Sequence, residues 1–256
     1  MYHEAAFRVG ARDADIFGQC RPSAMMDFLQ EAATGAAIAL HVSREETLRD
    51  YGAFWMLARI WYRLEEPVLW DDRLTVQTWH RGDGHGPSMY RDFDIFRAGR
   101  RIGEGVSIWV LADAETRRLR RVSELPGFRE TTGGERCKSR MLSKLRPPVP
   151  LETAGTRQLG YSDCDVNGHV NNTRYADFAC DAIALERLGS GLFVSQVQIG
   201  YLKECLPGER LTLSAGRLDG TFYVQGDGEE GRARFDAALT LTPPDNPPPP
   251  CRNTSN

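Results

Sequence analysis

The sequence has few of the features that mark secreted, membrane-spanning or metal-binding proteins. No apolar run approaches about 20 residues, so no membrane span is expected. The chain starts without a basic segment followed by an apolar run, and its early Glu and lack of Ser argue against a transit peptide. No cysteine belongs to a C-x-x-C pair or a zinc-like spacing, so we expect reduced thiols, no metal and no cofactor in a bacterial-type cytoplasmic protein. The six cysteines are Cys20, Cys137, Cys164, Cys180, Cys205 and Cys251.

The chain also lacks a strong overall charge. Its 256 residues carry a net charge of −3, and no helix-turn-helix segment stands out, so nucleic acid is not an expected partner. One segment is locally basic: residues 115–146 contain ten lysines and arginines against four glutamates. Prolines then follow at 147, 148 and 150, a composition typical of a linker. The proline-rich tail from Pro243 is expected to be disordered.

The most informative segment is 165–172, Asp-Val-Asn-Gly-His-Val-Asn-Asn. Asp165, Asn167 and His169 place a carboxylate, an amide and an imidazole where a helix is expected to begin. Asp165 or Asn167 can cap that helix, and free N–H groups at its start favour a developing oxyanion. The segment therefore offers a general base, an orienting amide and an electrophilic pocket.

Two other interpretations apply to the same turn. Asp, Asn and Gly are common turn residues without any catalytic role. The spacing also fits the opening of a calcium loop, but the twelfth position, which should be a bidentate Glu, is Arg174. Calcium is therefore excluded.

Two halves of the chain show the same order of signals. Each has a strand, a Gly-containing turn, a helix and then further strands with period-2 alternation. The first half has strands near 3–10, 54–65, 73–81, 88–98 and 101–112, with a hairpin tip at Gly99-Arg100 and a helix over about 22–40. The second half has strands near 155–160, 192–203, 209–217, 220–227 and 231–241, with a helix over about 170–188.

Local matches indicate a tandem duplication. Asp15-Ile-Phe-Gly-Gln aligns with Asp165-Val-Asn-Gly-His, and Arg73-Leu-Thr-Val aligns with Arg210-Leu-Thr-Leu. The first half is longer between these anchors, with its extra residues expected around 42–53. In the first copy Phe17 and Gln19 replace the amide and the imidazole, so we expect one catalytic site per chain, in the second half.

With these motifs the chain resembles the acyl-acyl carrier protein thioesterases. The likeness covers roughly residues 3–241 in order, and the D-x-N-x-H-V-N-N element is fairly specific for this group. The segments that carry it are the run from Asp165 to Tyr175, Tyr201-Leu-Lys-Glu-Cys205, Gln30-Glu-Ala-Ala33, Trp55-Met-Leu-Ala-Arg-Ile60, Val76-Gln-Thr-Trp79, Tyr90-Arg-Asp-Phe93, Ser107-Ile-Trp-Val110 and Thr116-Arg-Arg-Leu119.

The resemblance implies an α+β tandem hotdog, in which each antiparallel sheet wraps a central helix. It implies an N-terminal hotdog domain over 1–130 that binds the acyl chain and carries the degenerate site. A basic, proline-rich linker over 131–150 and a catalytic C-terminal hotdog domain over 151–242 follow, before the tail 243–256.

The resemblance also assigns the site. The catalytic residues would be Asp165, Asn167, His169 and Glu204, with Cys205 beside them. If the Arg73/Arg210 match fixes the register, Pro67 stands opposite Glu204 in the first copy.

Two mechanisms are open. In the first, Glu204 activates water that attacks the thioester carbonyl. In the second, Cys205, His169 and Asn167 form a nucleophilic triad. On a strand, the side chains of Glu204 and Cys205 would point to opposite faces, so only one of them can face the site. A Cys on an apolar face is ordinary, whereas a Glu on an inward-facing position requires a functional explanation. This favours the mechanism in which Glu204 activates water.

The substrate would contact two further regions. The acyl chain is expected to bind along Met25, Met26, Phe28, Leu29, Trp55 and Met56, although such residues are also ordinary core. Acidic acyl carrier protein is expected to dock on Arg117, Arg118, Arg120 and Arg121, although a solvated basic linker explains them equally.

Other functions use the same fold. An acyl-CoA thioesterase would need the same site, and a non-catalytic acyl-binding or regulatory hotdog protein would need neither His169 nor Glu204. Acyl length, and whether the chain is a monomer or a homodimer, do not follow from the sequence.

Overall fold

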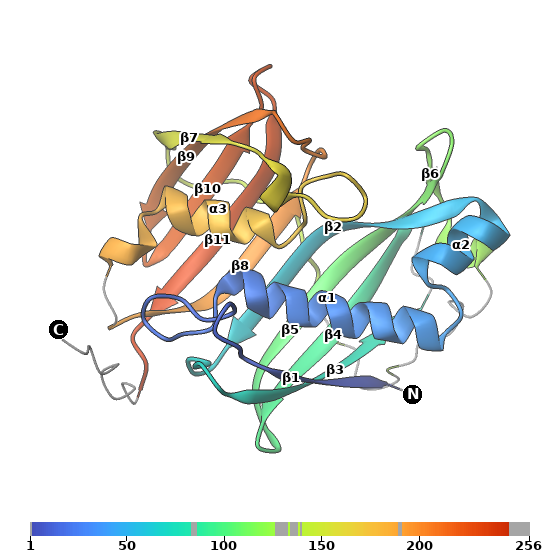
Figure 1. The fold of residues 1–256 in the computed structure, drawn as a ribbon, viewed down its shortest axis with the longest axis horizontal. Helices are drawn as coiled ribbons and strands as arrows, with labels where there is room; N and C mark the ends of the chain where they lie inside the picture. The colour runs from blue at the N-terminus through green and yellow to red at the C-terminus, as the bar shows by residue number, and fades with distance from the viewer. Residues whose placement is uncertain are drawn as a thin grey trace. The chain divides into compact units, whose positions relative to one another are not determined.

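The computed structural model describes residues 2–82, 86–125, 133, 138, 140–188 and 191–245. They form two compact units, which we describe separately (Figure 1). The first unit comprises 1–7, 27–62 and 73–144, and the second comprises 8–26, 63–72 and 145–256. Within the described ranges, no helix has the length and apolar character needed to cross a membrane.

The sheet of the first unit lies against one long helix. In spatial order its strands are β1 (His3–Arg8), β3 (Arg73–His80), β4 (Ser88–Arg97), β5 (Arg100–Asp113) and β2 (Ala53–Leu64). Helix α1 (Pro22–Ala39) packs on one face, where Phe28 stacks on Phe7 with the ring centroids 4.9 Å apart. Gly105 of β5 faces Leu29 and leaves room for the helix.

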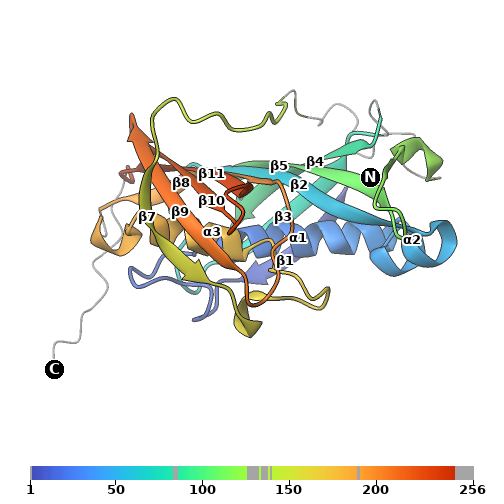
Figure 2. The ribbon, with the colours of Figure 1, turned by 90° about the horizontal axis from the view of Figure 1, so that it is seen from above.

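A strap that includes residues 138 and 140–142 lies on the opposite face of this sheet (Figure 2). Leu142 packs with Trp61 in the core, and the Arg140 guanidinium lies 3.7 Å from the Trp61 ring centroid. The strap is held by buried Asp92, whose carboxylate accepts hydrogen bonds from Arg81 and from the Lys138 N–H. This part of the predicted linker is therefore packed on the sheet.

The second unit repeats the arrangement with a shorter helix. Its strands are ordered β8 (Phe193–Tyr201), β11 (Ala233–Thr242), β10 (Thr221–Asp227), β9 (Arg210–Leu218) and β7 (Glu152–Gln158). Helix α3 (Arg174–Ala182) packs on β7, β9, β10 and β11 (Figure 1). Tyr175 of α3 contacts Phe235 and Tyr201 edge-on, at centroid distances of 5.1 and 5.5 Å.

The predicted strands are confirmed to within about three residues at each end. The helix predicted over 170–188 is wrong in extent, because α3 covers only Arg174–Ala182 and a separate 3₁₀ turn covers Leu185–Arg187. The predicted hairpin tip is also shifted: Ala98 and Gly99 both have positive φ, so they form the turn and Arg100 begins β5.

The extra residues of the first half, predicted around 42–53, form α2 (Arg44–Tyr51). This helix starts with a capping box in which Ser43 and Glu46 satisfy each other's backbone N–H groups. It ends at Gly52, which has φ 57°. The short strand β6 (Leu119–Arg120) and the 3₁₀ turn Val122–Glu124 complete this end of the first unit.

Matching backbone hydrogen bonds fix the register between the two copies of the repeat. The Val9 N–H donates to the Asp72 carbonyl at 2.9 Å, and the Leu159 N–H donates to the Glu209 carbonyl at 2.9 Å. The Cys20 N–H likewise donates to Val68, and the Val170 N–H donates to Cys205. Val68 is therefore equivalent to Cys205, which places Pro67 at the position of Glu204, as the sequence predicted.

Candidate active site

The turn that carries Asp165, Asn167 and His169 is held by its own backbone. The Asp165 N–H donates to the His169 carbonyl at 2.9 Å, and the Gly168 N–H donates to the Asp165 carbonyl at 3.0 Å. The Asp165 carboxylate accepts a bond from the Asn167 N–H at 2.8 Å, and Gly168 supplies the positive φ of 76° that the turn needs. Asp165 therefore shapes the turn, and the Asn167 side chain is exposed to solvent.

The structure brings His169 and Glu204 together. The His169 Nε2 lies 3.5 Å from the Glu204 carboxylate, and the side chains are 28% and 48% exposed. A second link supports this contact, because the Tyr201 hydroxyl donates to the Asn172 carbonyl at 2.9 Å. An imidazole and a carboxylate at this separation, open to solvent, are suited to share and transfer a proton with a bound water.

Cys205 lies next to Glu204 but in a different environment. Its side chain is fully buried and is hydrogen bonded with Tyr175. Burial raises the pKa of the Cys205 thiol, against the smaller opposing effect of the Tyr175 hydrogen bond, so the thiolate is disfavoured. The prediction that both residues lie on a strand is wrong, since β8 ends at Tyr201. Their side chains nevertheless point in different directions, because Glu204 contacts His169 while Cys205 is buried in the core.

The expected helix cap and helix-based oxyanion site are not found. Helix α3 begins at Arg174, and its N-cap, Thr173, makes no side-chain cap bond. The backbone N–H groups of Val170, Asn171, Thr173 and Arg174 already donate within the protein, to Cys205, Asp163 and Asn171. The His169 N–H, in contrast, has no acceptor among the described residues.

Asp163 anchors the segment that leads into the turn, a role that the sequence did not predict. Its carboxylate is 4% exposed and accepts bonds from the Gly160 N–H, from Arg157 at 2.9 Å and from Arg174 at 3.4 Å. Burial by itself would raise the pKa of Asp163, but the hydrogen bonds from Gly160 and Arg157 outweigh it, so the pKa is lowered. The available signal was Asp13, the equivalent residue in the first copy, which accepts the same bond from Gly10.

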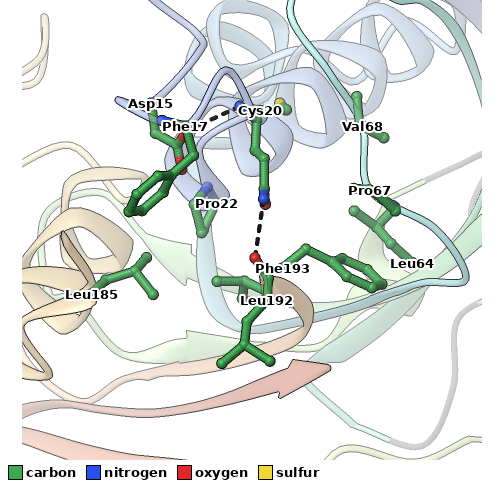
Figure 3. Close-up of a pocket in the computed structure, with 12 residues that line it drawn as sticks. Asp15, Phe17, Cys20, Pro22, Leu64, Pro67, Val68, Leu185, Leu192 and Phe193 are labelled. Atoms are coloured by element: carbon green, nitrogen blue, oxygen red, sulfur yellow. Dashed lines mark hydrogen bonds between the residues drawn. The ribbon is translucent and has the colours of Figure 1, made fainter. Parts of the chain in front are cut away.

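The first copy keeps the turn but has closed it. The Asp15 carboxylate accepts bonds from the Phe17 and Gln19 N–H groups, and the Gln19 side chain donates to the Leu192 carbonyl at 3.0 Å. Figure 3 shows the small cavity left there, with Phe17 and Pro67 among its walls. It measures about 20 Å³, room for roughly one water molecule.

The walls that the first copy contributes to this cavity have counterparts in the second copy, and Leu185, Leu192, Phe193 and Val194 complete the lining. Asp15, Phe17, Gln19, Cys20, Pro22, Leu64, Pro67 and Val68 occupy the positions of Asp165, Asn167, His169, Val170, Asn172, Tyr201, Glu204 and Cys205. The cavity therefore lies at the equivalent of the site, with Gln19 and Pro67 where the second copy has His169 and Glu204. Within the described part of the chain, no cluster of His, Cys, Asp or Glu is arranged to hold a metal ion.

The residues predicted to bind the acyl chain are mostly core. Met25, Met26, Phe28 and Leu29 are each less than 7% exposed. Trp55 packs on the apolar cluster around Met89, and Met56 is partly buried. This packing suits a core as well as the walls of an acyl channel, so the assignment stays a prediction.

The four arginines predicted to dock the carrier differ in surroundings. Arg120 donates to the Tyr51 carbonyl and to Glu124, so it holds the end of the first unit together. Arg117 lies 5.0 Å from the Phe54 ring centroid but is exposed, as are Arg118 and Arg121. Of the other predicted features, Arg129, Arg136, Cys137, Cys251 and the tail from 246 lie outside the described residues.

Comparison with known proteins identifies the family of the chain. Residues 1–125 match the acyl-ACP thioesterase N-terminal domain and residues 154–237 match its C-terminal domain. The chain is 29% identical over 172 residues to an oleoyl-acyl carrier protein thioesterase of Coriandrum sativum, covering 62% of this chain and 46% of that one. It is 25% identical over 244 residues to a dodecanoyl-[acyl-carrier-protein] hydrolase of Umbellularia californica, covering 86% and 63%. The chain thus spans about half the length of the first of these curated relatives and somewhat less than two thirds of the second.

Solved structures share the fold over nearly the whole chain. An acyl-ACP thioesterase from Bacteroides thetaiotaomicron aligns with a TM-score of 0.79 at 20% identity, covering 94% of this chain and 98% of that one. The 12:0-ACP thioesterase from Umbellularia californica aligns with a TM-score of 0.76 at 20% identity, covering 94% and 97%. Both units are hotdog folds, and the chain belongs to the acyl-ACP thioesterase family.

Proposed function

We propose that the protein hydrolyses the thioester of fatty acyl-acyl carrier protein, releasing a free fatty acid and ending chain elongation. The observation that carries this proposal is the contact between His169 and Glu204 in the second copy, at positions where the first copy has Gln19 and Pro67. A protein that only binds acyl groups would have no need to keep this pair in one copy.

In the proposed reaction Glu204 acts as the general base. It takes a proton from a water molecule, whose oxygen attacks the thioester carbonyl, while His169 holds the carboxylate or the water in place. The C–S bond then breaks, and the departing thiolate takes the proton from Glu204. Because a thiolate leaves readily, little acid assistance is needed.

The oxyanion needs hydrogen-bond donors, and the turn supplies two candidates. The His169 N–H and the exposed Asn167 side-chain amide make no other hydrogen bond within the described structure. Removing one such preorganised donor typically costs about 3–4 kcal/mol in the transition state. Asp165 supports both donors by shaping the turn.

The carrier and the acyl chain would bind through the first half of the chain. We propose docking of the acidic carrier on Arg117, Arg118 and Arg121, with Arg120 holding this surface in shape. We assign the acyl channel to the six apolar residues named above. The free thiols of Cys20, Cys164, Cys180 and Cys205 support a reducing compartment, and we propose a bacterial cytoplasm.

The test is hydrolysis of a panel of carrier-bound thioesters, from octanoyl to stearoyl, by wild type and His169→Ala. Turnover that disappears in the folded variant supports the proposal and identifies the preferred chain length. Turnover that persists in His169→Ala would remove His169 from the reaction. Measuring kcat/KM for the same acyl groups on CoA distinguishes an acyl-CoA thioesterase, and no hydrolysis on either carrier would leave an acyl-binding protein.

A further inference from the structure

A backbone hydrogen bond that holds the turn in the first copy has no counterpart in the second. In the first copy the Trp70 N–H donates to the Gly18 carbonyl at 2.8 Å, so the 63–72 segment holds the turn. The register places Pro207 at the position of Trp70 in the second copy. Proline has no N–H, so the corresponding bond to the Gly168 carbonyl cannot form.

Neighbouring backbone hydrogen bonds between the same two segments are present in both copies. One residue pair nearby, Cys20 with Val68, is bonded at 2.7 Å, and its counterpart, Val170 with Cys205, is bonded at 2.9 Å. The two segments thus approach each other equally in both copies. The missing bond follows from the chemistry of Pro207 rather than from a displaced loop.

As a result the second copy presents a free acceptor beside the catalytic pair. Gly168 is exposed, and its carbonyl receives no hydrogen bond from the described residues. It directly precedes His169, whose imidazole lies 3.5 Å from Glu204. In the first copy the equivalent carbonyl is occupied, and the corresponding site is reduced to a cavity of about 20 Å³.

We propose that the Gly168 carbonyl binds an amide N–H of the substrate's thiol arm, and that Pro207 keeps this carbonyl available. The proposal rests on the proposed thioesterase function. The thiol arm of acyl carrier protein, a phosphopantetheine, contains amide groups, and CoA ends in the same chemistry. An amide entering a site needs an acceptor to replace the water it loses, and a backbone carbonyl at the rim supplies one.

The experiment pairs a change in the protein with a change in the substrate. The substrates are an acyl thioester of N-acetylcysteamine, which has an amide N–H, and its analogue in which an ester oxygen replaces that N–H. The variant Pro207→Ala restores a backbone N–H at the rim, and it is expected to fold because Pro207 is exposed. Trp70→Pro removes the equivalent bond in the first copy and serves as the matched control.

We expect wild type to prefer the amide substrate by roughly threefold to tenfold in kcat/KM, the range of one neutral hydrogen bond. Pro207→Ala should reduce this preference to near one, because its own N–H occupies the carbonyl. Trp70→Pro should keep the wild-type preference. On acyl carrier protein and acyl-CoA substrates, Pro207→Ala should lower kcat/KM by a similar factor, because both end in the same thiol arm. A loss on one carrier alone would place the effect on the carrier rather than on the arm and would contradict the proposal.

The failure of this inference can be told apart from the failure of the proposed function. If wild type hydrolyses both small substrates equally well, or if Pro207→Ala keeps the amide preference, the Gly168 contact is refuted while thioesterase activity stands. If wild type hydrolyses neither the small thioesters nor any carrier-bound thioester, the proposed function itself is refuted and the inference falls with it.

Discussion

Replacing Cys205 and Glu204 separately discriminates between the two mechanisms that the sequence left open. The Cys205 side chain is fully buried and hydrogen bonded with Tyr175, whereas Glu204 is 48% exposed and contacts His169. Burial also raises the pKa of the Cys205 thiol, which disfavours the thiolate that a nucleophile needs. We therefore expect Cys205→Ala to affect stability and Glu204→Gln to affect catalysis.

The magnitudes follow from these surroundings. Cys205→Ala removes a buried sulfur and its contact with the Tyr175 side chain, which should lower the free energy of unfolding by about 2 kcal/mol. For a chain of this size that loss corresponds to a melting temperature lower by roughly 4–8 °C. Glu204→Gln keeps the shape of the side chain but removes the base, so kcat should fall by about 10²–10⁴-fold with little change in melting temperature.

The assay is hydrolysis of one carrier-bound thioester below the melting temperature of each variant, with thermal unfolding measured in parallel. Cys205→Ala should retain kcat within about tenfold of wild type, since a structural shift alone acts at this scale. A folded Cys205→Ala variant with no turnover, together with an active Glu204→Gln variant, would refute the reasoning and establish the thiol as nucleophile.

Three further outcomes are expected. Asp163→Asn should lower the free energy of unfolding by about 3 kcal/mol near neutral pH, because it removes a buried carboxylate that is paired with arginine. Asp13→Asn in the first copy should lower the free energy of unfolding by less. Denaturant titrations of the two variants compare these losses. Since the pKa of Asp163 is lowered, its contribution is present above the ordinary carboxyl pKa and is lost as pH falls through the lowered value, so the variant should show a flatter acid-unfolding profile. Arg121→Glu should raise KM for acyl carrier protein substrates without changing thermal stability. Arg120→Glu should lower thermal stability, because Arg120 is bonded to the Tyr51 carbonyl and to Glu124. Equal KM changes for Arg121→Glu on carrier and CoA substrates would contradict specific docking. Tyr201→Phe should lower the free energy of unfolding by about 1 kcal/mol and kcat by less than tenfold, and an unchanged kcat would show that its bond to the turn is not needed for catalysis.

The strands could be predicted closely because their signal is local. Period-2 alternation and Gly-containing turns mark each strand, and a one-residue error would turn its apolar side chains away from the core. The register between the copies was also predictable, since Arg73 and Arg210 both begin a strand and stand at equivalent positions. Pro67 was therefore placed opposite Glu204 correctly.

The start of the second helix could not be predicted in the same way. Asp165 and Asn167 are good N-cap residues, but the Asp165 carboxylate caps its own turn, through the Asn167 N–H. Asn171 then forms a second turn by accepting from the Thr173 N–H, which delays the helix until Arg174. Two polar turns in succession have the same composition as one helix cap, so the sequence does not separate them.

The contrast between the copies shows which contacts the sequence pattern does not reveal. Both copies build the same turn on the same strands, and they differ in what reaches the turn from elsewhere. In the first copy Gln19 and Trp70 form hydrogen bonds that close it. In the second copy His169 pairs with Glu204, and Pro207 leaves the backbone of the turn available. One repeated scaffold thus gives a largely filled turn in one copy and an accessible His169–Glu204 pair in the other, through changes at a few contact positions.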